Sequence, residues 1–416
     1  MKYRVLLLAI LTAILTFNYV DRLALGLMLQ EIKLDLSLSD TELGLLTGLA
    51  FALFYSFMGI PLARWADRGN RIAIITLTAT IWSVMVALCG VATSFAQLLV
   101  IRVGVAVGEA GCIPPAHSLI AEYFDRSERP RAMARYMLGG PLSCVIGYFV
   151  AGWLNERLGW RITFIILGAP GLLLAAVAWF SLDEPRQSAR IAGALEKEAP
   201  RAQPGLKEVC LSLWPNRAFR HIAVALSLLS FFNLGAGSWQ PTFFIRSFGL
   251  QSGELGLWLT VLFGLGGLLG TYLGGEWAGR YAGKDEPRQL KVAAVALGVS
   301  GLILPLVYLS AHSVASLSYL GVAVVMQAMT GGPLFATVQT LVPRHLRAMS
   351  VAVIYLFSNL IGMGLGPLAV GALSDAFQPW FAEESLRYSL LCMCPGLVWV
   401  AWHLWRASRT VVTEVG

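Results

Sequence analysis

The feature that most constrains this chain is a series of long, nearly uninterrupted apolar segments. A helix needs about 20 apolar residues to cross a bilayer, whereas a membrane β-barrel alternates apolar and polar residues over about ten. The chain is 57% hydrophobic and 13% charged, against about 45–50% and about 25% in soluble domains. We therefore predict an all-α membrane protein, and exclude a soluble enzyme, a disordered chain and a nucleic-acid-binding module. Twelve transmembrane helices are expected, at 4–29, 42–64, 72–93, 96–123, 132–154, 161–181, 220–245, 254–276, 291–310, 316–340, 348–372 and 386–406.

The net charge of +7 arises from an uneven distribution of basic residues along these helices. With the N-terminus placed inside, 24 of the 31 lysines and arginines fall in inner connections and tails. Because basic residues concentrate on the cytoplasmic side, we expect a multi-pass protein of the inner (plasma) membrane with both termini cytoplasmic. Met1–Val20 lacks a small-residue cleavage site and is expected to remain as the first helix. The other seven basic residues are Lys33, Arg157, Arg161, Arg246 and Arg387 in outer connections, and Arg22 and Arg102 inside helices.

A polar stretch divides the chain into halves that repeat one another. We expect an N-terminal six-helix bundle at 1–182, a cytoplasmic linker at 183–217 and a C-terminal six-helix bundle at 218–416. Thr41–Arg68 aligns without a gap to Gly253–Arg280 at an offset of 212, with nine identities in 28 positions. An even number of helices per copy gives the copies the same orientation. Such parallel duplication is typical of alternating-access carriers, whose substrates bind between the halves.

Several segments carry a resemblance to known families. Ala63-Arg64-Trp65-Ala66-Asp67-Arg68-Gly69-Asn70-Arg71 and the Gly139-Gly140-Pro141 run resemble signatures of the major facilitator superfamily. Ala63 replaces a usual glycine, and Gly279 replaces the aspartate in the second copy. Asn18-Tyr19-Val20-Asp21-Arg22 and Arg102–Ala110 resemble bacterial members of the spinster (Spns) lipid transporter family, although organic-anion symporters share the first motif. The resemblance implies that helices 1, 4, 7 and 10 line a central cavity.

Four ionisable residues, Asp21, Arg22, Arg102 and Glu109, lie inside predicted helices of the first half. Burying a charge at mid-bilayer costs at least 2.5–3.5 kcal/mol, so such residues normally face a cavity and have partners. At 1.5 Å per residue, Asp21 and Arg102 both lie roughly 6 Å from the outer edge of the core, and Glu109 lies near its middle. We predict a proton-coupling site of Asp21, Arg102, Glu109 and Arg22. For Arg22, the alternative is a partner elsewhere or an outward orientation. The alternatives are static ion pairs, or a first helix that ends at Asp21-Arg22.

Two further groups of residues are candidates for gating and substrate binding. The resemblance implies a cytoplasmic gate of Asp67, Arg68 and Arg71, although simple charge anchoring also explains Arg71. The polar and aromatic residues expected in the cavity are Asn18, Tyr19, Arg102, Asn233, Trp239, Gln240 and Gln327. Interhelical hydrogen bonding is the alternative role for each residue of the second half.

These observations predict a proton-coupled secondary transporter that works by alternating access. The substrate expected is an amphipathic organic anion such as a lysophospholipid or sphingoid phosphate; small hydrophilic anions such as sugar acids are the alternative. A non-transporting receptor or a membrane-bound enzyme is the alternative of another class. The sequence has no phosphate loop, His/Glu metal cluster or Ser-His-Asp arrangement, so no enzyme activity, cofactor or metal is expected. The six cysteines form no disulfide framework, and we expect a monomer whose partners are substrate, protons and membrane lipid.

Overall fold

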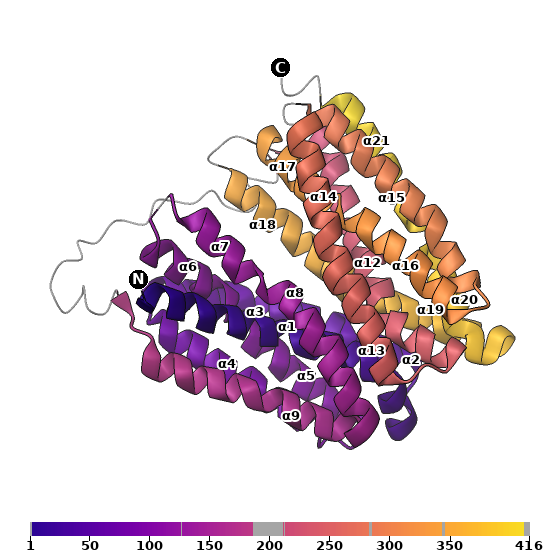
Figure 1. Ribbon diagram of the computed structural model, residues 1–416, viewed down its shortest axis with the longest axis horizontal. Coiled ribbons are helices and arrows are strands. Elements are labelled where there is room, and N and C mark those ends of the chain that lie inside the picture. The colour runs from indigo at the N-terminus through magenta and orange to yellow at the C-terminus, as the bar shows by residue number, and fades with distance from the viewer. Residues whose placement is uncertain are drawn as a thin grey trace. The chain divides into compact units, whose positions relative to one another are not determined.

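The computed structural model describes residues 2–125, 127–185, 211, 213–282, 285–342 and 346–411, and none of these lies in a β-strand (Figure 1). Ten helical stretches are long and apolar enough to cross a membrane. Two of them, Arg131–Ser181 and Met349–Thr410, have 51 and 62 residues, more than twice the length of one crossing. Each contains a break in the helical backbone, at Gly159 (φ 76°) and at Ala382 (φ 47°). The described chain therefore makes twelve crossings, as the apolar segments predicted.

The first six crossings begin with one unbroken helix and then use several shorter ones. α1 (Lys2–Leu36) is the first crossing, and the helix runs without a break through Asp21 and Arg22. This continuity excludes a first helix that ends at these two residues. The helices that follow are α2 (Asp40–Thr47), α3 (Leu49–Arg68), α4 (Arg71–Cys89), α5 (Phe95–Ala110), α6 (Ile113–Tyr123), α7 (Arg129–Met137), α8 (Gly139–Cys144), the π-helical turn η1 (Val145–Val150) and α9 (Ala151–Ser181).

The last six crossings follow the same plan. The seventh is the long helix α12 (Arg217–Phe248), which extends beyond the predicted end and takes in Arg246. The helices after it are α13 (Ser252–Leu259), η2 (Thr260–Leu265), α14 (Gly266–Tyr281), α15 (Glu286–Leu309), α16 (Ser313–Ala328), α17 (Gly331–Leu341), α18 (Arg347–Phe357), η3 (Ser358–Leu365), α19 (Gly366–Phe381), η4 (Ala382–Glu384), α20 (Ser385–Met393) and α21 (Pro395–Thr410).

Two of the interruptions within a crossing lie just before a proline. The fourth crossing breaks at Gly111-Cys112, just before Pro114, and the eleventh breaks before Pro367. A proline inside a helix lacks the amide hydrogen and clashes with the preceding turn, so it favours such breaks. α2 begins at a capping box, in which the Ser39 hydroxyl accepts from the amide of Glu42 and the Glu42 carboxylate accepts from the amide of Ser39.

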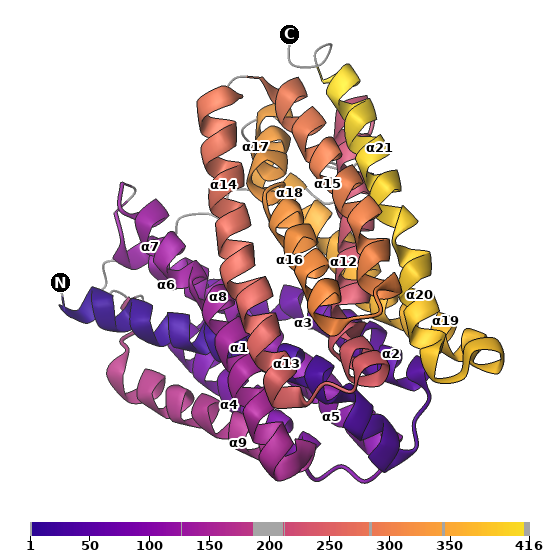
Figure 2. The ribbon, with the colours of Figure 1, turned by 45° about the vertical axis from the view of Figure 1, so that its right-hand side comes forward.

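The chain forms two compact units that correspond to the two halves of the sequence except for two short segments. Unit 1 comprises residues 1–38, 50–201 and 251–257, and unit 2 comprises residues 39–49, 202–250 and 258–416. The long helices of unit 2 run side by side along a common direction (Figure 2). Most of the predicted linker lies outside the described residues, as does Cys210, and the other five cysteines are free.

The two exchanged segments make equivalent contacts in the two units. In unit 2, the Asp375 carboxylate accepts from the amides of Asp40, at 3.0 Å, and Thr41, at 2.7 Å, at the start of α2. In unit 1, the Glu156 carboxylate accepts from the amide of Gly253, at 2.9 Å, near the start of α13. Thr41 aligns with Gly253 in the sequence repeat. The repeat therefore has a structural counterpart, in which an acidic side chain binds the N-terminus of a helix.

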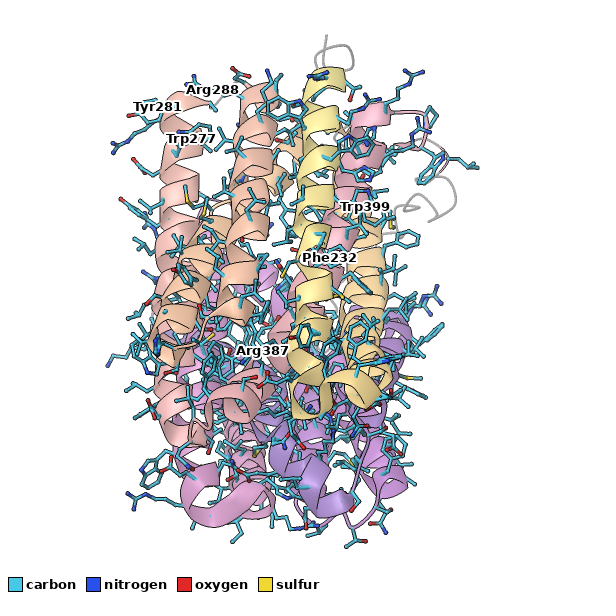
Figure 3. All side chains as sticks on the ribbon, turned by 90° about the vertical axis from the view of Figure 1, so that its right-hand side faces the viewer. Phe232, Trp277, Tyr281, Arg288, Arg387 and Trp399 are labelled. Atoms are coloured by element: carbon cyan, nitrogen blue, oxygen red, sulfur yellow. The ribbon has the colours of Figure 1, made fainter. Side chains whose placement is uncertain are left out.

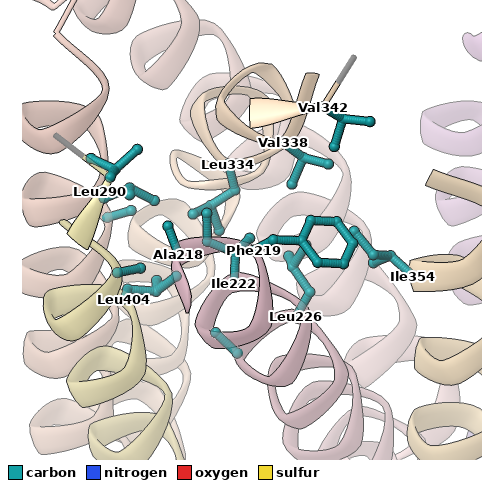
Figure 4. Packing of buried hydrophobic residues seen from close by; sticks show 14 of the residues in the cluster. Ala218, Phe219, Ile222, Leu226, Leu290, Leu334, Val338, Val342, Ile354 and Leu404 are labelled. Atoms are coloured by element: carbon teal, nitrogen blue, oxygen red, sulfur yellow. The ribbon is translucent and has the colours of Figure 1, made fainter. Parts of the chain in front are cut away.

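The core at one end of unit 2 is a cluster of buried aliphatic residues (Figure 4). It forms where one face of the first turns of α12 packs against α15, α17, α18 and the last turns of α21. The opposite faces of α12 and α21 are thereby left for polar and aromatic residues. The cluster members labelled in the figure are Ala218, Phe219, Ile222, Leu226, Leu290, Leu334, Val338, Val342, Ile354 and Leu404.

Candidate functional site

The first part of the candidate site is a buried ion pair between α1 and α5 of unit 1. Nη1 of Arg102 donates to Oδ2 of Asp21 at 2.6 Å, and the two side chains are 1% and 2% exposed. The two residues come from different helices and were expected at the same depth. A buried pair with this geometry links the two helices.

The second part is another ion pair between the same two helices. Nε of Arg22 donates to Oε2 of Glu109 at 2.9 Å, and a second nitrogen of Arg22 binds the same oxygen. Glu109 is fully buried, whereas the Arg22 side chain is 22% exposed. Because residues 21 and 22 are adjacent, the two pairs lie next to one another. Together they contain two arginines and two carboxylic acids. The sequence did not identify the partner of Arg22, and the structure shows that it is Glu109.

Aromatic rings of α3 cover both guanidinium groups, and sequence analysis missed them. The Arg22 guanidinium carbon lies 4.5 Å from the centre of the Phe51 ring and 4.9 Å from that of Tyr55. The Arg102 guanidinium lies 5.2 Å from the Phe51 ring. Cation–π contacts of this kind stabilise a desolvated guanidinium by about 2 kcal/mol. The sequence does contain a signal for these rings. Phe51 and Tyr55 are four residues apart, a spacing that places both rings on one face of the helix.

Several polar atoms of this cluster have no hydrogen-bond partner in the described protein. They are Oδ1 of Asp21, Oε1 of Glu109, Nε of Arg102 and both amide atoms of Asn18, which is 0% exposed. The carboxylates of Asp21 and Glu109 also lie close enough to act on one another electrostatically. A buried polar atom without a partner costs about 1–3 kcal/mol. Each carboxylate therefore keeps one oxygen available to a proton or another donor.

A groove in unit 1 runs along α1 toward this cluster. It has a volume of about 480 Å³ and lies between α1 and the α7–α8–η1 segment. The lining of the groove includes two hydroxyl-bearing residues, Thr12 and Thr16, and one charged residue, Arg135. The apolar residues that line it are Val5, Leu8, Ala9, Ala13, Phe17, Leu142, Val145 and Ile146. The groove can therefore hold an apolar chain beside a cation.

The three residues assigned to a cytoplasmic gate have different surroundings. Arg71 is fully buried in unit 1, where it forms ion pairs with Glu184 and with Glu122 at 2.5 Å. Arg68 is exposed at the end of α3, and the side chain of Asp67 lies outside the described residues. Arg71 therefore joins the start of α4 to the segment that follows α9. The gate itself stays a prediction.

The polar residues expected to line the cavity in the second half have mixed roles. Trp239 is fully buried, and its ring nitrogen donates to the carbonyl of Pro367 at 2.9 Å. The side-chain nitrogen of Gln327 donates to the hydroxyl of Ser300 at 2.8 Å. Gln240 is 6% exposed, and its side-chain oxygen has no described partner. Asn233 is half-buried, as is Tyr19 in unit 1, whose ring lies 5.4 Å from the Arg22 guanidinium.

Unit 2 contains a buried charge network that sequence analysis also missed. Two nitrogens of Arg246 donate to the two carboxylate oxygens of Asp40, each at 2.7 Å. The Ser374 hydroxyl donates to the same carboxylate at 2.6 Å. Arg246 had been placed in an outer connection, because the seventh helix was expected to end one residue before it.

Twelve apolar crossings in two related halves, with a neutral cluster of buried charges in one unit, define a multi-pass membrane transporter. The chain belongs to the Major Facilitator Superfamily, whose sequence description matches residues 11–405. This is a family of transporters and not of enzymes, as the sequence led us to expect.

Comparison with individual proteins narrows the resemblance. The chain is 31% identical to an MFS-type efflux pump of Mycolicibacterium smegmatis, over 97% of this chain and 94% of the pump. It is 25% identical to protein spinster homolog 1 of Xenopus laevis, over 95% and 79% of the two chains. Its structure resembles that of a bacterial homologue of the human lysosomal transporter Spinster in an inward-facing, unoccupied conformation. The TM-score is 0.85 at 29% identity, over 99% and 98% of the two chains. The resemblance to spinster proteins found in the sequence is thus confirmed.

Proposed function

We propose that the protein is a proton-coupled secondary transporter of an amphipathic organic anion. The observation that carries the proposal is the pair of adjacent buried ion pairs, Asp21–Arg102 and Arg22–Glu109, in which each carboxylate keeps one oxygen without a partner. A proton carrier needs a carboxylate oxygen that no other donor of the protein occupies.

The proton step uses the two carboxylates. Arginine stays protonated under all physiological conditions, so Asp21 and Glu109 are the groups that can exchange a proton. A proton placed on one of the unpaired oxygens neutralises that carboxylate and weakens its ion pair. The charge balance of the cluster then changes by one, which biases the equilibrium between the two states of an alternating-access carrier.

The substrate step uses the arginines and the groove. Arg22 has the largest exposed surface of the four charged residues, so it is the one that an anionic head group would reach first. The groove supplies the apolar lining for a single acyl chain and ends one turn before the cluster along α1. Relatives include a protein named as spinster homolog 1 and a hexuronate transporter of Bacillus subtilis, at 25% and 23% identity. The groove favours the amphiphile over the small hydrophilic anion.

The proposed topology follows the positive charges, with both termini in the cytoplasm and the chain in the inner (plasma) membrane. The transporter is proposed to act as a monomer, with Asp67, Arg68 and Arg71 near its cytoplasmic gate.

Proteoliposome transport tests this proposal. Uptake of a lysophospholipid and of a hexuronate is measured with and without an imposed proton gradient, for the wild type, Asp21→Asn and Glu109→Gln. We expect both variants to bind the lysophospholipid and to lose the response to the gradient. Asp35→Asn is the matched control, because Asp35 is an acidic residue of the same helix in a half-exposed ion pair with Arg161. Gradient-driven uptake by both variants would refute the coupling role, and uptake of the hexuronate alone would refute the substrate class.

A further inference from the structure

A cluster of histidine and tryptophan side chains lies between the start of α12 and the end of α21 in unit 2. The Nδ1 atoms of His221 and His403 are 3.0 Å apart. The Trp402 ring packs against both imidazoles, with centroids 6.0 and 4.8 Å away, and Trp399 lies 6.0 Å from His403. Figure 3 shows Trp399 on α21, the helix that finishes at the end of unit 2 marked by Tyr281 and Arg288.

The depth of this cluster corresponds to the polar edge of a bilayer. His221 lies four residues after the start of α12, and His403 lies seven residues before the end of α21. At 1.5 Å per residue, they are about 6 and 10 Å from the helix ends. The head-group layer on each side of the hydrocarbon core is about 5–8 Å thick. Trp399 and Trp402 are 53% and 51% exposed. Trp402 is adjacent to His403, and exposed tryptophans are usual near the membrane interface, whereas Trp399 lies about one turn deeper.

The cluster carries positive charge that no carboxylate of the described chain neutralises. Arg220 and Arg406 both act electrostatically on His221, and neither forms an ion pair within the described residues. The start of α15, which packs on α21, carries Asp285, Glu286, Arg288 and Lys291 and adds no net charge. Near the N-terminus of unit 1, by contrast, Arg4 is paired with Glu128 at 2.9 Å.

The histidine pair adds a hydrogen-bond donor to this charge. In a bond between two Nδ1 atoms one ring donates and the other accepts, so the accepting ring carries its own proton on Nε2. No described residue binds either Nε2 atom, so the pair keeps at least one Nε2–H that has no partner among the described residues. Two guanidinium groups and an imidazole N–H, without a nearby acceptor charge, match the oxygens of a phosphate. The tryptophan rings provide apolar surface for the glycerol and acyl chain beside it.

We propose that this cluster, formed by Arg220, His221, Trp402, His403 and Arg406, binds the phosphate of an anionic phospholipid of the surrounding bilayer. The position at head-group depth and the exposed tryptophans favour a lipid over a phosphate ion in solution. The inference is independent of the proposed transport function, because the coupling cluster belongs to unit 1.

Native mass spectrometry of the purified protein tests the proposal. Retention of phosphatidylglycerol is compared with that of phosphatidylcholine of the same chain length. Each basic residue near a membrane surface contributes about 1 kcal/mol to the binding of anionic lipid. The double variant Arg220→Ala/Arg406→Ala should therefore bind phosphatidylglycerol about thirtyfold more weakly. Arg4→Ala is the matched control and should bind as the wild type does, because Arg4 is neutralised by Glu128.

A second variant keeps the test decisive if the arginine double variant fails to fold. His221→Gln/His403→Gln leaves the charges and most of the packing in place, and it should also retain less phosphatidylglycerol than the wild type. Equal retention of the two lipids by the wild type, or unchanged retention by both double variants, would overturn the proposal. Displacement of the lipid by inorganic phosphate as effectively as by added phosphatidylglycerol would also overturn it, since the site would then serve a soluble anion.

Discussion

Replacement of Arg102 by leucine, alone and together with replacement of Asp21, separates the two explanations of the buried charges, a static ion pair and a coupling element. The substitution leaves the Asp21 carboxylate 2% exposed and without its cationic partner. Removal of one partner of a buried pair costs about 3–5 kcal/mol. Loss of the contact between the Arg102 guanidinium and the Phe51 ring, 5.2 Å away, costs about 2 kcal/mol more, because this guanidinium is buried. We therefore expect Arg102→Leu to lower the free energy of unfolding by about 5–7 kcal/mol.

The double variant Asp21→Leu/Arg102→Leu should recover most of that loss. Replacing both members of a buried pair with apolar residues of similar volume is often neutral or stabilising. Unfolding of the purified protein by SDS in mixed micelles, followed by helix circular dichroism, gives both free energies. A loss below about 1 kcal/mol for Arg102→Leu alone would show that Asp21 reaches water or another donor, and would refute the reasoning. Proton-driven uptake by the stable double variant would show that the pair is static.

Three further substitutions test other parts of the structure. Arg246→Ala leaves the buried Asp40 carboxylate without its two 2.7 Å bonds and should destabilise the protein by about 3 kcal/mol in the same assay, whereas a loss below 1 kcal/mol would contradict the network. Gly371→Ala places a Cβ 2.2 Å from the carbonyl oxygen of Asp40 and should lower the melting temperature, while Gly59→Ala, which meets nothing within 4 Å, should not. Phe51→Leu keeps the apolar packing but removes a ring 4.5 Å from the Arg22 guanidinium. It should lower the free energy of unfolding by about 1 kcal/mol and weaken the binding of an anionic substrate. An unchanged affinity would show that Phe51 is not part of the site.

In the candidate site, the depth of a charged residue along its helix predicts some ion-pair partners but not others. Depth along the helices placed Asp21 level with Arg102, since the rise per residue is constant and both helices start at a membrane surface. The partner of Arg22 did not follow from depth. Adjacent residues point about 100° apart, so the rotation of α1 against α5 decides whether Arg22 meets Glu109 or turns away. The aromatic cover from α3 depends on a third helix and was not predicted.

By itself, the sequence determined the membrane-spanning fold, the duplication and the four intramembrane ionisable residues of the first half, Asp21, Arg22, Arg102 and Glu109. These properties reside in local runs of about 20 residues, because the bilayer penalises each unpaired polar group wherever the helix packs. Only the tertiary structure decided the partners. It enclosed Arg71 between Glu122 and Glu184, assigned Asp40 to unit 2 beside Arg246, and left Arg220 and Arg406 without a carboxylate in the described chain. The physical reason is that an ion pair forms within about 4 Å, a distance set by helix rotation and register between segments far apart in the chain.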